Sequence, residues 1–164
     1  MLSKEIRKYI IQPALSAALW NDIDSDILTY GTGYVETNYQ AVMQTGTPKN
    51  GGIGFFQEQP SDYADKLTWF KNGFNHMMLD RILMGCNYIA LPADVIHCAY
   101  NVAYGALICR VHYYRATKQK LPSVKDPDAA RLFAEFHKTF YNGGGKADVD
   151  KNTDIFKRII NGEI

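Results

Sequence analysis

The spacing of apolar residues along the chain predicts a mainly α-helical protein. Strict alternation of apolar and polar positions, which marks a half-buried strand, is nearly absent. Apolar residues recur instead at helical intervals, as at Ile155, Phe156, Ile159 and Ile160 near the C-terminal end. The pattern therefore predicts roughly seven helices with little or no sheet.

Helix-capping residues and helix breakers divide this pattern into segments. Serine, aspartate and asparagine favour the N-cap, proline the first turn, and glycine the end of a helix. The expected helices are a first one capped by Ser3 and kinked at Pro13, then residues 26–39, 61–70, 73–85, 92–117, 126–141 and 153–160. The segment 92–117 is apolar almost all round, so it is expected to be the central buried helix. Residues 42–56, rich in glycine, predict a small loop or β element.

Length, composition and charge narrow the class of protein. The 164 residues predict one domain over 1–164, and 46% hydrophobic with 21% charged residues is typical of a soluble globular protein. A formal net charge of +1 gives no general field to attract polyanions, so nucleic acid is not an expected partner. No apolar run reaches the ~20 residues that a stable membrane span needs.

Cysteine and histidine spacing gives no sign of a metal or a cofactor. The three cysteines, Cys86, Cys98 and Cys109, are odd in number and form no Cys-x-x-Cys pair, so we interpret them as buried free thiols. The four histidines lack the His-Glu-x-x-His spacing of zinc enzymes. We expect them to be core or surface residues: His76, His97, His112 and His137.

Three short motifs carry the candidate chemistry. Glu36-Thr37 ends the predicted helix 26–39, Gly-Phe-Phe-Gln-Glu-Gln-Pro follows at 54–60, and Tyr-Asn-Gly-Gly-Gly-Lys comes at 141–146. In order and approximate spacing they resemble the Glu-Ser, Gly-Leu-Met-Gln-x-x-Pro and Tyr-Asn-Ala-Gly-x-Gly-Arg motifs of the lysozyme-like lytic transglycosylases, which cut peptidoglycan. The segment 110–115 also resembles the Arg-x-x-Tyr-x-Arg segment of small phage-encoded muralytic proteins. We expect its two arginines, Arg110 and Arg115, to anchor their helix by pairing with carboxylates.

The resemblance implies a lysozyme-like helical domain that cleaves the bond between N-acetylmuramic acid and N-acetylglucosamine. Glu36 would act first as general acid and then as base, while the 6-hydroxyl of the substrate attacks and forms a 1,6-anhydro product. No cofactor is needed. The implied substrate-binding residues are Thr37, Phe56, Gln57, Tyr141 and Asn142.

The residues themselves support an acid at Glu36 but leave the outcome of the reaction open. A glycosidase acid needs a pKa raised by an apolar setting, which neighbours such as Tyr34, Val35, Tyr39, Phe55 and Phe56 can supply. Most glycosidases also use a second carboxylate. If the chain is a hydrolase, the candidates for that role are Glu58, Asp62 and Asp65.

Two departures from the family pattern support a second hypothesis. Thr37 replaces the usual serine, and Glu58 stands where an apolar residue is common. A catalytically inactive virion structural or cell-wall-binding protein with a lysozyme-like fold is therefore the alternative, and a plain helical assembly protein is a third. In the leading hypothesis the chain comes from a tailed phage and its partners are peptidoglycan glycan strands, with other virion proteins as further candidates. Its expected location is the virion, or the host periplasm and cell wall after synthesis in the host cytoplasm.

Overall fold

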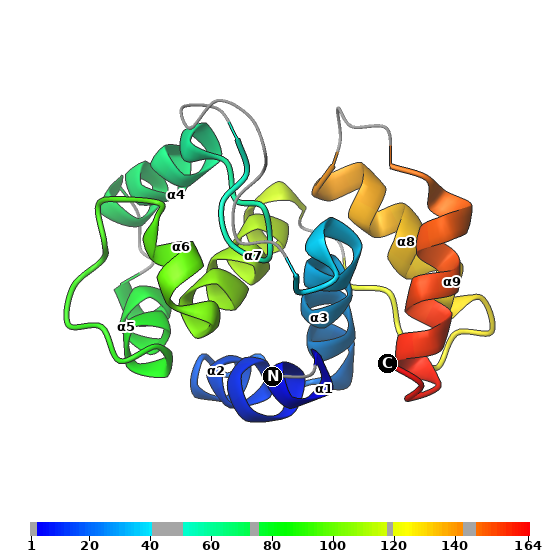
Figure 1. Cartoon of the computed structure of the whole chain (residues 1–164). Helices are drawn as coiled ribbons and strands as arrows, with labels where there is room; N and C mark the ends of the chain where they lie inside the picture. Colours follow the sequence, from blue (N-terminus) through cyan, green and yellow to red (C-terminus); the bar gives the residue numbers. More distant parts are fainter. Residues whose placement is uncertain (1–2, 41–50, 73–75, 118–119, 143–146) are drawn as a thin grey trace.

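The computed structural model is mainly helical, as the apolar pattern predicts (Figure 1). It describes residues 3–40, 51–72, 76–117, 120–142 and 147–164, and these contain helices but no strand. The helices are α1 (Ser3–Ile6), the π-helical η1 (Arg7–Ile11), α2 (Gln12–Ala17), α3 (Ile23–Thr37), α4 (Pro60–Asn72), α5 (His76–Gly85), α6 (His97–Tyr100), α7 (Val102–Ala116), α8 (Ala129–Phe140) and α9 (Val149–Ile160).

The centre of the molecule is α7. Its residues 104–111 are all buried, and it packs against η1, α2, α3, α5 and α6. This confirms that the central buried helix lies within 92–117. The prediction of one continuous helix there is wrong, because Asn101 adopts an extended backbone (φ −127°, ψ 101°) and its side chain caps α7 by accepting from the Tyr104 amide. Residues 92–96 precede α6 and are not helical.

Other helix ends also differ from the predicted ones. Helix α3 begins at Ile23 rather than 26, since Asp22 caps it by accepting from the Ser25 amide. It ends at Thr37 because the next two residues adopt positive φ. Helix α9 begins at Val149 rather than 153, capped by Asp148, and α8 begins at Ala129 rather than 126.

The loop before α4 contains the small β element in its described part. A single antiparallel bridge joins Ile53 to Glu58, with Gly54 (φ 74°) and Gln57 (φ 52°) in the turn between them. A side chain at Gly54 would clash with the carbonyl of Cys98, so the close approach of the loop to α6 requires glycine there. Residues 42–50 of the predicted element lie outside the described residues.

Helices α3, α8 and α9 form one side of the molecule, with α9 packed against both of the others (Figure 1). Gly31 of α3 faces the ring of Phe156 in α9, where a larger side chain has no room. The C-terminal ends of α3 and α8 and the start of α9 lie at the same end of this group (Figure 1). None of the helices in the described ranges combines the length and the hydropathy needed to cross a bilayer.

Candidate functional site

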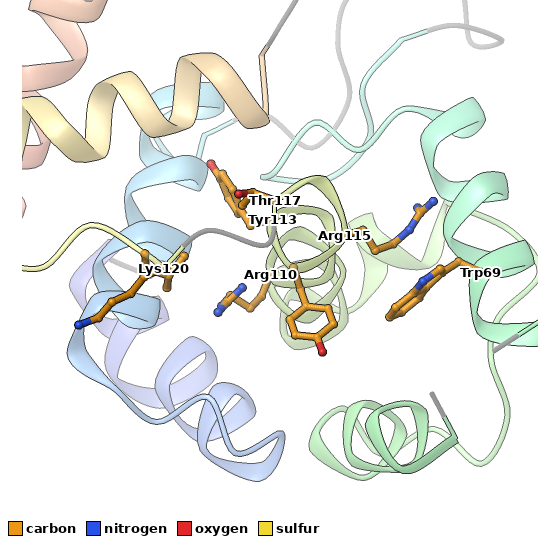
Figure 2. Close-up of a pocket in the computed structure, with 8 residues that line it drawn as sticks. Trp69, Arg110, Tyr113, Arg115, Thr117 and Lys120 are labelled. Carbon is orange, nitrogen blue, oxygen red and sulfur yellow. The ribbon is translucent and has the colours of Figure 1, made fainter. Parts of the chain in front are cut away.

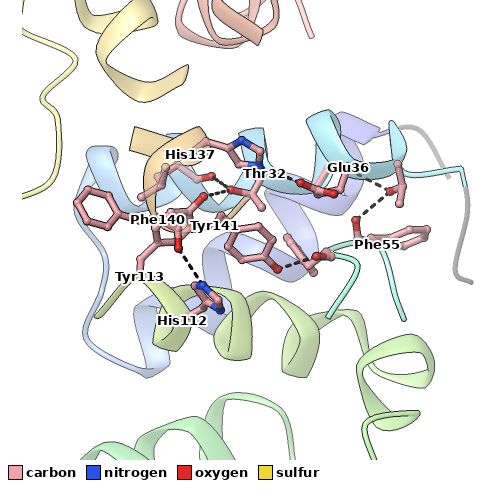
Figure 3. Close-up of polar contacts among 12 residues, drawn as sticks. Thr32, Glu36, Phe55, His112, Tyr113, His137, Phe140 and Tyr141 are labelled. Atoms are coloured by element: carbon pink, nitrogen blue, oxygen red, sulfur yellow. Dashed lines mark hydrogen bonds and ion pairs between the residues drawn. The ribbon is translucent and has the colours of Figure 1, made fainter. Parts of the chain in front are cut away.

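Glu36 lies in the last turn of α3 and pairs with a histidine of α8. Its Oε1 lies 3.0 Å from Nε2 of His137 (Figure 3). The side chain of His137 is fully buried, whereas that of Glu36 keeps 16% exposure. The imidazole also stacks on the ring of Tyr141, with the centroids 5.7 Å apart. Packing therefore fixes the imidazole of His137, while the carboxylate of Glu36 stays within reach of solvent.

The partners of His137 assign its ring proton. Its Nδ1 is buried without a hydrogen-bond partner among the described residues, and its Nε2 faces a carboxylate oxygen. A buried N–H without an acceptor is rarer in proteins than an under-used acceptor. We therefore place the proton of the neutral ring on Nε2, from which it donates to Glu36. The sequence alone gave no reason to single out His137, which lacks any motif spacing.

A pocket of about 310 Å³ opens beside Glu36 where α3, α8 and α9 meet. Among the described residues, its walls provide two carboxylates, one ammonium group, two side-chain amides and a little apolar surface. The lining residues are Val35, Glu36, Asn142, Ala147, Asp148, Lys151 and Asn152. Two of the predicted site residues, Glu36 and Asn142, thus share one pocket. The remainder of the third motif, residues 143–146, lies outside the described residues.

Three of the predicted substrate-binding residues hold the loop 51–59 in place. The hydroxyl of Thr37 donates to the carbonyl oxygen of Phe55 over 2.9 Å (Figure 3). The hydroxyl of Tyr141 donates to the carbonyl oxygen of Phe56 over 2.6 Å (Figure 3). Phe56 itself is 1% exposed. Burial raises the pKa of the Tyr141 phenol well above its usual value, so this hydroxyl stays a neutral donor. These residues join the loop to the ends of α3 and α8.

Gln57 supports the turn of the same loop. Its Nε2 donates to the carbonyl oxygen of Gly54 over 2.9 Å. Among the described residues, this amide contacts the loop backbone and not Glu36. The sequence-based expectation that Gln57 binds the acid or a sugar is therefore a prediction that the observed contacts do not support.

Glu58 belongs to a buried network away from the Glu36 pocket. Its carboxylate is 3% exposed and pairs with the ammonium of Lys66, which is 1% exposed. Lys66 Nζ lies 3.1 Å from Nδ1 of His112, and His112 Nε2 donates to the carbonyl oxygen of Phe140 over 2.9 Å. Burial raises the pKa of Glu58, opposed by Lys66. Burial, and then Lys66, lowers the pKa of His112 to about 4.

The other two fallback carboxylates also lie apart from Glu36. Asp62 and Asp65 are exposed on α4 and line a separate pocket of about 220 Å³ beside Lys66 and His112. The carboxylate that shares the pocket of Glu36 is Asp148. No sequence signal distinguishes it from an ordinary helix N-cap, which it also is.

The largest of the pockets described lies along α7 and contains both arginines of the segment 110–115 (Figure 2). It measures about 580 Å³. The guanidinium of Arg110 lies over the ring of Trp20 and that of Arg115 over the ring of Trp69, and in Figure 2 the two side chains point to opposite sides of the helix. Neither forms an ion pair among the described residues, so the expected pairing with carboxylates is wrong.

The three cysteines are buried free thiols, which confirms the sequence interpretation. Within the described ranges, no group of three or more potential ligands is placed to hold a metal ion.

Comparisons with protein-family models, with curated proteins and with solved structures found no match. The chemistry proposed for this chain therefore depends on the geometry of the Glu36 pocket and on the three motifs.

Proposed function

We propose that this chain is a peptidoglycan-cleaving glycosidase in which Glu36 is the general acid and base. The observation that carries the proposal is a carboxylate held by a buried histidine at the edge of a pocket rich in amide groups. Contact with His137 engages Oε1 of Glu36 and leaves Oε2 for the glycosidic oxygen. A proton delivered from such a positioned group contributes about 10²–10⁴-fold to a rate.

The favoured reaction is lytic rather than hydrolytic. The 6-hydroxyl of the muramic acid is part of the same molecule, so its effective concentration far exceeds that of an incoming water. Glu58, Asp62 and Asp65 do not line the pocket of Glu36. Asp148 does, but its Oδ1 already accepts from the amides of residues 150 and 151 at the start of α9. A reaction that needs a single carboxylate suits this arrangement best.

One observation favours the alternative of a wall-binding virion protein without turnover. The side chains of Thr37, Gln57 and Tyr141, which the resemblance assigns to substrate binding, instead donate hydrogen bonds to carbonyl oxygens of the loop 51–59. In that case the pocket recognises a glycan strand and Glu36 is a binding group. Both functions imply peptidoglycan as the partner, and both suit a phage virion or the host periplasm.

Muropeptide mass spectrometry after incubation with purified sacculi tests the proposal. We expect fragments that end in 1,6-anhydro-muramic acid, with the same yield in EDTA because Glu36 needs no Lewis acid. Fragments that carry only reducing ends would indicate that the reaction is hydrolysis and not the lytic reaction. Sacculi that sediment with the protein but stay intact would favour the non-catalytic alternative.

A further inference from the structure

Arg110 of α7 is a mostly buried cation in the wall of the pocket of about 580 Å³ (Figure 2). It is 8% exposed and forms no ion pair among the described residues. Its Nε donates to the hydroxyl of Ser25 over 3.2 Å, and its Cζ lies 5.1 Å from the ring centroid of Trp20. These contacts fix the guanidinium plane. Its two Nη groups have no hydrogen-bond partner in the described part of the chain, and neither is sealed from solvent.

The protein compensates the charge of Arg110 only indirectly. Burial lowers the pKa of the guanidinium, and the carboxylate of Asp22 opposes this. Both oxygens of Asp22 already accept from Ser25, one from its amide and one from its hydroxyl. Asp22 therefore acts on Arg110 through Ser25 rather than by direct contact. Buried charges in proteins are normally paired, so a guanidinium held in this way favours an anionic ligand.

The described lining of the same pocket is otherwise cationic. Arg110, Arg115 and Lys120 line it, and no aspartate or glutamate does. The residues outside the described ranges include no acid either, so none of them can bring a carboxylate to this pocket. Arg115 also lines the neighbouring pocket with Asp62 and Asp65, which share its charge. Arg110 and Lys120 therefore remain as the cations for a bound anion, and both lie on the same side of α7 in Figure 2.

Aromatic rings lie beside these cations. Tyr114 and Trp69 line the pocket, with their ring centroids 6.2 Å apart, and Tyr114 keeps 49% exposure. Exposed aromatic faces provide apolar surface on which a ring of a ligand can pack. The volume of about 580 Å³ falls within the range of roughly 300–1,000 Å³ for small-molecule sites. These features suit an anionic group attached to a ring.

We propose that this pocket binds a small ring-bearing phosphate ester, with Arg110 and Lys120 as the ligands of the phosphate. A phosphate monoester carries a charge of about −1.5 to −2 at pH 7, which matches two cations better than one carboxylate does. The planar fork of a guanidinium also fits two phosphate oxygens at once. The site shares no lining residue with the pocket of Glu36, so it does not depend on the glycosidase function.

Calorimetric titration of the full chain at constant ionic strength tests the phosphate and the ring separately. Glucose 6-phosphate is compared with glucose, and adenosine monophosphate with adenosine. We expect at least one ester to bind about tenfold or more tightly than its uncharged parent, the effect of one or two hydrogen bonds to a charged group. The tighter ester then identifies the sugar or the base as the ring. Inorganic phosphate should bind more weakly than that ester.

Two outcomes of this titration would contradict the proposal. If neither ester bound more tightly than its parent, the pocket would not be a phosphate site. If inorganic phosphate bound as tightly as both esters, the aromatic rings would have no part in binding. Cleavage of sacculi is not measured here, so failure of the glycosidase function would leave these results unaffected.

Variants locate the phosphate within the molecule. Lys120→Gln removes an exposed charge that the fold does not need, and we expect it to raise the Kd of the ester about tenfold with an unchanged Tm. Arg110→Gln should weaken binding at least as much. Lys157→Gln, which removes an exposed lysine of α9 away from this lining, is the matched control and should bind like the wild type. Wild-type affinity in a folded Lys120→Gln would refute the assigned ligands, whether or not Arg110→Gln folds.

Discussion

Two pairs of a carboxylate with a basic side chain, Glu36 with His137 of α8 and Glu58 with Lys66 of α4, differ in access to solvent. Glu36 contacts His137 and keeps 16% exposure at the edge of a pocket. Glu58 contacts Lys66, and both are at most 3% exposed. The second pair continues through His112 to the carbonyl oxygen of Phe140, one residue before Tyr141.

The difference in exposure distinguishes a carboxylate that a substrate can reach from one that stabilises the fold. Glu58 with Lys66 joins the loop 51–59 to α4, and His112 extends the contact to α7 and α8, so this network holds the frame of the site. A buried ion pair is stable only while both partners are present. Glu36 has the same chemical group in a place that a substrate can reach. Under the proposed function, exposure to solvent rather than residue type makes Glu36, and not Glu58, the candidate for the catalytic role.

The largest effect is expected for Glu36→Gln. The amide keeps the size of the side chain but delivers no proton, so cleavage of sacculi should fall by about 10²–10⁴-fold. Circular dichroism should show an unchanged fold. Turnover at the wild-type rate in a folded variant would remove Glu36 from the mechanism.

Lys66→Met should act on stability instead. It leaves the carboxylate of Glu58 buried without its cation, and we expect the free energy of unfolding in urea to fall by about 3–5 kcal/mol. The double variant with Glu58→Leu should recover most of that loss, because no buried charge remains. Unchanged stability in Lys66→Met alone would show that the network of Glu58, Lys66 and His112 does not stabilise the fold around the site.

The low pKa of His112 predicts a loss of stability in acid. Its folded value is about 4, below the ordinary 6.5, so between these values the unfolded chain binds the proton and the native protein does not. Stability is therefore fully present above about pH 6.5 and declines as the pH falls toward 4, by up to about 3 kcal/mol. Glu58, whose pKa is raised, acts in the opposite direction. Urea unfolding should therefore be measured against pH for both the wild type and His112→Gln, because the contribution of Glu58 is common to both and cancels in the difference. Parallel pH profiles of the two proteins would show that His112 does not cause the loss of stability in acid.

His137→Leu should lower kcat by about 10–100-fold, the effect of one hydrogen bond to a charged group. In the proposed mechanism His137 acts through Glu36 as a positioning residue, so KM should change little. His137→Gln places an amide near the lost Nε2 and should recover part of the rate. A variant with Leu that cleaves as fast as one with Gln would show that the contact is only structural.

The smallest effect is expected for Asp148→Asn. Asparagine also caps helices, so stability should change by less than about 0.5 kcal/mol. In a lytic reaction the product should stay 1,6-anhydro-muramic acid and the rate should stay within a few-fold. A large loss of rate together with reducing-end products in the wild type would identify Asp148 as the base that activates water.

The local pattern of residues was enough for the helical class and for the helix that carries Glu36. Apolar spacing identified α7 as the buried centre, and the odd, scattered cysteines indicated free thiols. These inferences succeeded because helix periodicity and burial depend on neighbours within one or two turns. Exact helix starts were predicted less well, since Asp22, Asn101 and Asp148 competed with equally suitable caps nearby.

Tertiary packing alone decided the composition of the candidate site. Glu36 and His137 are 101 positions apart in the chain, and no local rule relates them until α3 and α8 lie together. The same packing placed Asp148 and Asn152 beside Glu36 and put Glu58 in a separate buried network. The sequence by itself thus determined which chemical groups the chain can offer. Only the fold decided which of them share a pocket, because burial and pairing depend on contacts between distant segments.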